Sequence, residues 1–358
     1  MDLTRLSRQV LYNCDVSDAR HAGIYSICGL AMRLRDLYKW ERGLAPWQED
    51  EAARVLEWIG AKEELWETLL DADFDPLPVN GRSFKPFDTR PINSALASFN
   101  LFYGAGYAYS LKPTFFLAEV VHMQCVSGHQ VRFLGRELAR DLLTLPAFGQ
   151  DGEVVIREQA ARMFLWDQIA YISNSGRRAL DFALRACGLP DTHAETIRSH
   201  FDVLARVQQQ IMLDHEIGEL EETVFLRDSW QAMLADYPHT TVELLVRALK
   251  DLLADTGPHG ALTGLLEHRD EAALGLYLAF GNGITRLLTR ELICAFDAFS
   301  QDRRWDRMMA AAREVRQKTV AHTRRVLELY HEGRKGNDSE RTQRTIEAFM
   351  RRQGWLPG

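Results

Sequence analysis

Apolar residues recur at helical spacing through the first 70 residues of the chain. They return every three or four positions in segments 48–59 and 62–70, which is the period of an amphipathic helix. Ser17 and Asp18 are helix-capping residue types, and an apolar pattern follows them as far as Leu37. The pattern therefore predicts a small N-terminal helical unit over residues 1–70.

This periodicity disappears after residue 70. Four prolines and the turn-forming pair Asn80-Gly81 lie within residues 71–93. Prolines and Asn-Gly pairs interrupt regular structure, so we expect a linker or long loop over residues 71–93, with a unit boundary inside it.

The middle of the chain carries a strand pattern. Residues 114–134 are rich in phenylalanine and valine and are divided at Ser127-Gly128, which favours two strands joined by a turn. A short helix is expected over 136–143, and residues 153–156 are expected to add a strand. We interpret residues 94–190 as a mixed unit that contains a β-hairpin.

The remainder of the chain has helical period almost throughout, with interruptions at Gly188-Leu189-Pro190, Tyr237-Pro238 and Gly257-Pro258. This pattern predicts a C-terminal helical domain over residues 191–358. The predicted fold class is mostly α, a multi-helix architecture with a small β-hairpin element in the middle of the chain.

Composition narrows the class of protein without naming a function. Of the 358 residues 46% are apolar and 26% charged, the proportions of an ordinary globular protein. The first twenty residues contain no apolar run typical of a secretory signal, and polar residues interrupt the most apolar stretch, 97–121. The five cysteines form no CxxC pair, which suits reduced thiols. We therefore expect a cytoplasmic protein with no membrane segment.

Three segments resemble a bacterial family of uncharacterised proteins. They are SDARHAGIYSICGLAMRLRDLYKWE at 17–41, SLKPTFFLAE at 110–119 and LGRELARD at 134–141. The family has no known function, so the resemblance implies only that these segments belong to its recognisable core.

The strongest candidate chemistry lies in LDHEIGELEETV, residues 213–224, inside a helix expected over 197–235. His215, Glu219 and Glu222 fall near one side of that helix, at the border of an apolar stripe. Ionisable groups in an apolar setting must be paired, open to a cavity or bound to a cation. One imidazole and two carboxylates suit zinc, iron or manganese, so this trio is a candidate metal site.

The same residues resemble the zincin motif HExxH with Glu219 in place of the second histidine. The alternative is an acidic helix that faces solvent or pairs with arginines.

Two Glu-x-x-His pairs suggest a di-iron bundle but fit it poorly. Glu119 and His122 lie in the predicted hairpin, where residues three apart point to opposite faces. Glu328 and His331 share a helical face with arginines, which is typical of a solvated surface.

Charge is unevenly distributed. Residues 301–358 contain 14 Lys+Arg and 8 Asp+Glu, a net charge of +6 in a chain whose total is -7. Such a segment could contact nucleic acid, with Trp355 available to stack on a base. The interspersed acids favour a solvated helix over a nucleic-acid surface.

No nucleophile elbow, P-loop or dinucleotide-binding motif is present in the sequence. The leading functional expectation is therefore a non-enzymatic helical interaction or scaffold protein with a protein partner. The alternatives are a metal-dependent enzyme with a helix-borne His/Glu site, and nucleic-acid binding through the basic C-terminal segment. The sequence leaves substrate, partner and oligomeric state open.

Overall fold

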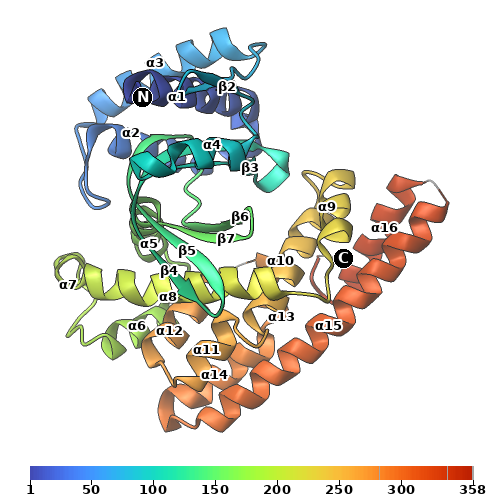
Figure 1. The fold of residues 1–358 in the computed structure, drawn as a ribbon. Coiled ribbons are helices and arrows are strands. Elements are labelled where there is room, and N and C mark those ends of the chain that lie inside the picture. Colours follow the sequence, from blue (N-terminus) through green and yellow to red (C-terminus); the bar gives the residue numbers. More distant parts are fainter. Residues whose placement is uncertain (282, 337, 357–358) are drawn as a thin grey trace. The chain divides into compact units, whose positions relative to one another are not determined.

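The computed structural model describes residues 1–281, 283–336 and 338–356 and divides the chain into two compact units, Met1–Ala170 and Tyr171–Gly358 (Figure 1). The sequence placed unit boundaries within 71–93 and at residue 190, whereas this division falls between residues 170 and 171.

The N-terminal unit combines helices with a five-stranded sheet. Its helices are α1 (Leu3–His21), α2 (Ile27–Arg42), α3 (Ala52–Leu69), α4 (Thr89–Leu96) and α5 (Glu158–Ala170), with short 3-10 turns at Ala22–Ile24, Ala97–Phe99 and Tyr109–Leu111. Its strands are β1 (Leu77–Val79), β2 (Arg82–Phe84), β3 (Leu101–Tyr107), β4 (Pro113–Val126), β5 (His129–Arg140), β6 (Ala147–Gln150) and β7 (Glu153–Arg157).

The main sheet has the order β3-β4-β5-β7-β6, and every neighbouring pair is antiparallel except β5 and β7. β4 and β5 form the predicted hairpin, with positive φ angles at Ser127 and Gly128 in the turn. The apolar face of α1, including Leu6 and Val10, packs with β3, β4 and the buried residues of β1 and α4. Segment 71–93 therefore contributes to the core of this unit.

Several sequence predictions need correction. The mostly helical character is confirmed, but a five-stranded sheet and the β1–β2 pair are more than a small hairpin element. The helix predicted over 136–143 is wrong because β5 continues to Arg140. Ser17 and Asp18 do not cap a helix, since both are buried inside α1. The strand predicted at 153–156 is confirmed as β7.

A buried group of charges ties α1 to the sheet. The Lys112 side chain is fully buried, and its Nζ lies 2.9 Å from Asp18 Oδ1 and 3.1 Å from Asp141 Oδ2. Both carboxylates are also almost fully buried. Burial, together with the charge of Asp141, raises the pKa of Asp18 to about 7 although the Lys112 ammonium opposes this. One ammonium between two carboxylates leaves excess negative charge, which favours a proton on Asp18.

Helices are the only regular secondary structure among the described residues of the C-terminal unit. Its helices are α6 (Arg177–Ala186), α7 (Ala194–Ser199), α8 (Phe201–Glu221), α9 (Arg227–Asp236), α10 (Thr241–Asp255), α11 (Ala261–Glu267), α12 (Glu271–Phe280), α13 (Gly283–Leu288), α14 (Arg290–Asp302), α15 (Trp305–Lys335) and α16 (Ser339–Arg352). α8 packs against α10, α11 and α12, and the long α15 packs against α10, α14 and α16. The single helix predicted over 197–235 is wrong, because α7, α8 and α9 are separate.

The cysteines of the chain are all free thiols in the structure. No helix within the described residues is both long enough and apolar enough to cross a bilayer.

A candidate metal centre between helices α8 and α10

Two helices of the C-terminal unit each present a pair of polar side chains one turn apart. His215 and Glu219 are four residues apart on α8, and Asp251 and Asp255 are four residues apart on α10. The two helices approach closely at Gly218, where a Cβ atom would lie 2.5 Å from the carbonyl oxygen of Ala254. Glycine at this position therefore lets the two polar pairs face each other.

Asp255 orients the histidine. His215 Nδ1 lies 2.7 Å from Asp255 Oδ1, and the Tyr277 hydroxyl from α12 donates to Asp255 Oδ2 at 2.8 Å. Because the carboxylate accepts from both partners, the proton of the imidazole is held on Nδ1, which leaves Nε2 as the ligand atom. Histidines that bind metals in proteins commonly donate their other ring nitrogen to a carboxylate in this way.

Glu219 and Asp251 complete, with His215, a group of three residues of the types that bind metal ions. One atom each from His215, Glu219 and Asp251 lies within 4.8 Å of the others. All three side chains are partly exposed, so a solute can reach the group. Glu219 Oε2 also pairs with Lys250 Nζ at 2.6 Å.

The surroundings carry more negative than positive charge. Four carboxyl groups, of Glu216, Glu219, Asp251 and Asp255, are accompanied by the basic groups of His215, Lys250 and Arg247. Burial raises the pKa of Glu216 to about 8 and that of Asp251 to about 6. The cluster therefore retains protons that an exposed group would release, which offsets part of its charge.

The pKa values of His215 and Glu219 are shifted in opposite directions. Burial lowers the pKa of His215, but the negative charge of Asp255 and the hydrogen bond to it outweigh burial and hold the pKa well above its usual value. Burial raises the pKa of Glu219, yet the charges of His215 and Lys250 bring it below its usual value. A cation that binds here must displace a proton from the imidazole.

These residues fit a divalent transition metal. One imidazole nitrogen and two carboxylate oxygens suit zinc, iron or manganese, and three protein ligands leave coordination positions for water or substrate. Metal–ligand distances of about 2.1 Å require opposite ligand atoms to lie within about 4 Å of each other, so coordination would draw these side chains slightly together.

Glu222, the third residue of the sequence-predicted trio, lies outside this group. α8 ends at Glu221, and the Glu222 carboxylate accepts the backbone N–H groups of Val224 and Phe225. Its side chain is therefore hydrogen-bonded within the turn that follows the helix. Asp251 takes the position that the sequence assigned to Glu222.

Sequence reasoning missed Asp251, Asp255, Tyr277 and Lys250. The available signal is the pair Asp251 and Asp255, two carboxylates at helical spacing within α10. Only the packing of α10 on α8 shows that this pair faces His215.

Comparison with known proteins identifies the family. Residues 5–157 match the N-terminal domain, and residues 162–349 the C-terminal domain, of a family of unknown function (DUF6866). The chain belongs to this family. The match confirms the resemblance to an uncharacterised family. No curated protein and no solved structure matches the chain significantly. The two matched domains of DUF6866 correspond closely to the two units of the structure.

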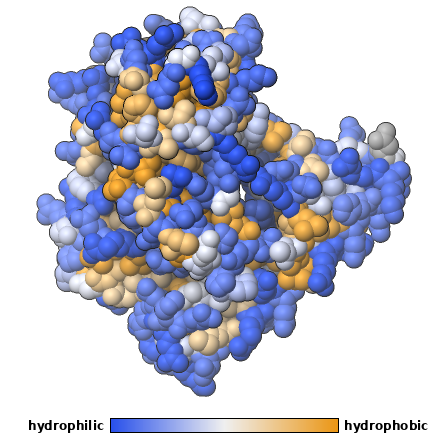
Figure 2. Space-filling model, viewed as in Figure 1, coloured by the Kyte–Doolittle hydropathy of each residue, from blue (hydrophilic) through white to orange (hydrophobic). Residues whose placement is uncertain are grey.

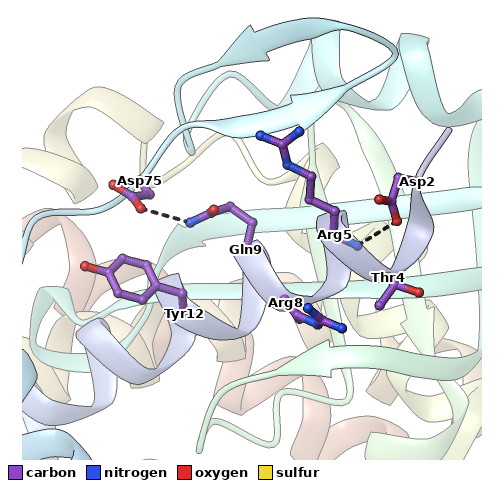
Figure 3. A pocket seen from close by; sticks show the side chains of 7 residues that line it. All are labelled: Asp2, Thr4, Arg5, Arg8, Gln9, Tyr12 and Asp75. Atoms are coloured by element: carbon purple, nitrogen blue, oxygen red, sulfur yellow. Dashed lines mark hydrogen bonds between the residues drawn. The ribbon is translucent and has the colours of Figure 1, made fainter.

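The N-terminal domain of this DUF6866 protein has a shallow depression of about 400 Å³ along α1, lined by Arg5, Arg8, Tyr12 and Asp75 among others (Figure 3). The Arg5 and Arg8 side chains leave the helix on different sides and do not converge on one point. Asp75 accepts from Gln9 at 3.3 Å. This depression brings together no set of groups comparable with the metal cluster.

In the DUF6866 C-terminal domain, many basic side chains of the net-positive segment are paired with acids. Such pairs include Lys318 with Glu291 and Glu314, Arg325 with Glu328, Arg344 with Glu340 and Arg351 with Glu347. The outer edge of α15 and α16 is hydrophilic in Figure 2. These pairs support a solvated helical surface, and nucleic-acid binding stays a prediction of the sequence.

Proposed function

We propose that the C-terminal domain binds one divalent transition metal ion, of zinc, manganese or iron, through His215, Glu219 and Asp251, and that the protein is a metal-dependent enzyme. The observation that carries this proposal is the Tyr277–Asp255–His215 chain of hydrogen bonds beside two converging carboxylates. A histidine that donates one ring nitrogen to a hydrogen-bonded carboxylate is typical of a metal ligand and is not expected in a solvated cluster of acids.

The groups around the site suit hydrolysis. A bound divalent ion would polarise a water molecule or a substrate oxygen. Glu216 follows His215 directly, and its carboxyl interacts with the charges of His215, Glu219 and Lys250. Burial raises its pKa to about 8, into the range in which general acid–base groups work.

The test is a calorimetric titration of chelator-treated protein with Zn²⁺ and with Mn²⁺. We expect one equivalent to bind with release of protons, because His215, Glu216 and Asp251 hold protons that the ion displaces. Repeating the titration in buffers of different ionisation enthalpy counts these protons. Affinity should rise between pH 6 and pH 8.

Two variants sharpen the test. His215→Ala should abolish binding, and Glu222→Gln should leave it unchanged because Glu222 caps the next turn. Equal binding by wild type and His215→Ala would contradict the assigned site.

A separate observation supports protein interaction by the N-terminal domain. β3 pairs with β4 only as far as Glu119, and no other described strand pairs with that edge of β4 over residues 121–126. Val121 is 60% exposed and Met123 57%. An open strand edge with apolar side chains is suited to adding an extended segment of a partner protein.

Selection from a peptide display library against the full chain tests this second proposal. We expect enriched extended peptides that bind the wild type and lose binding to Val121→Lys. Peptides that bind both proteins equally would show that this edge is not the docking site.

A further inference from the structure

Lys250 on α10 forms an ion pair with Glu219, one of the three ligand residues of the proposed centre. Its Nζ lies 2.6 Å from Glu219 Oε2, and the side chain is only 10% exposed. Its charge also acts on Asp251, the second carboxylate of the centre, and favours the ionised form of that group.

An ammonium in this position competes with a divalent ion. The Lys250 ammonium and a metal ion would neutralise the same excess of carboxylates. Both would also bind the same Glu219 oxygens. Two cations held close together in a partly buried setting repel each other strongly. Binding of a metal ion by Glu219 therefore favours departure of Lys250.

Trp230 on α9 contacts the same ammonium that pairs with Glu219. Lys250 Nζ lies 4.5 Å from the centroid of the Trp230 ring, within the range of a cation–π interaction. Since the lysine is nearly buried and already lies against this ring, Trp230 can hold the ammonium when Glu219 turns to another cation.

We propose that Lys250 is an internal counter-ion that keeps the centre closed to metal until a divalent ion displaces it from Glu219, while the face of Trp230 retains the ammonium. This inference rests on the metal site proposed above and adds the residue that regulates its loading. Lys250 is not a ligand. It sets the metal concentration at which the site fills.

The experiment compares Zn²⁺ binding to the wild-type chain with binding to Lys250→Met, Lys250→Gln and Lys250→Arg. Circular dichroism and thermal unfolding of each protein check that the fold is retained. Removing the charge should tighten Zn²⁺ binding at least tenfold in both the methionine and the glutamine variants. Lys250→Arg keeps the charge and should stay within threefold of the wild type.

The outcomes separate this inference from the proposed function. Zn²⁺ binding that is equal in wild type, Lys250→Met and Lys250→Gln, or weaker in the variants, overturns the role of Lys250 and leaves the metal site standing. The absence of Zn²⁺ binding in all four proteins overturns both. If one variant fails to fold, the other neutral variant decides.

Discussion

Lys112 is the residue whose loss should damage the N-terminal domain most specifically. Its buried ammonium pairs with Asp18 and Asp141, which are each 1% exposed. Lys112→Met replaces the lysine with an apolar side chain of similar length and leaves two buried carboxylates without their cation. Removing one partner of a buried ion pair costs about 3–5 kcal/mol, and we expect a loss in that range.

Hydrogen–deuterium exchange of peptides from α1 and β4, followed through a urea titration of the full chain, measures this loss locally. With a urea dependence of about 2 kcal/mol per molar, the expected loss corresponds to a midpoint lower by about 2 M. The loss should be smaller at pH 5 than at pH 8, because the abandoned carboxylates can take up protons at the lower pH.

Lys39→Met is the matched control. Lys39 is also 1% exposed, but its partner Glu49 is 63% exposed and stays hydrated when the lysine is removed. We expect the control to cost about 1 kcal/mol. Equal midpoint shifts in the two variants, or a Lys112→Met shift that is the same at both pH values, would refute the reasoning.

Three further predictions concern single side chains. The raised pKa of Asp18 adds stability that is fully present below pH 3.8 and is lost as the pH rises through about 7, so Asp18→Asn should flatten the fall in urea midpoint between pH 5 and pH 8. Gly218→Ala should lower the stability of the C-terminal domain by about 1–3 kcal/mol in thermal unfolding, because its Cβ would meet the Ala254 carbonyl; an unchanged melting temperature would argue against the close approach. Tyr277→Phe removes the hydroxyl that supports Asp255 and should weaken Zn²⁺ binding about tenfold in calorimetry, with the fold retained; unchanged affinity would separate Tyr277 from the centre.

The strands that could be predicted from the sequence are those with dense β-branched and aromatic residues. β4 and β5 were indicated by such residues around Ser127-Gly128. β3 was missed because its glycines weaken the strand pattern. Gly104 is required by packing, since a Cβ there would lie 1.9 Å from the Phe116 ring. A residue selected for close packing carries no periodic signal of its own.

Only the part of the candidate site that lies on a single helix, α8, was predictable from the sequence. His215 and Glu219 share a face of α8 through their spacing, and both belong to the observed group. Glu222 was included because the helix was expected to continue, and no glycine or proline directly follows Glu221 to mark the end of α8. Asp251 and Asp255 come from α10, which follows in the sequence but meets α8 only through tertiary packing.

Elemental analysis of untagged protein, purified without chelators, tests the central claim most directly. We predict close to one equivalent of zinc, manganese or iron per chain, lost in His215→Ala and Asp251→Asn and retained in Glu222→Gln. No metal in the wild type, even after anaerobic reconstitution, or full metal content in His215→Ala, would contradict the account.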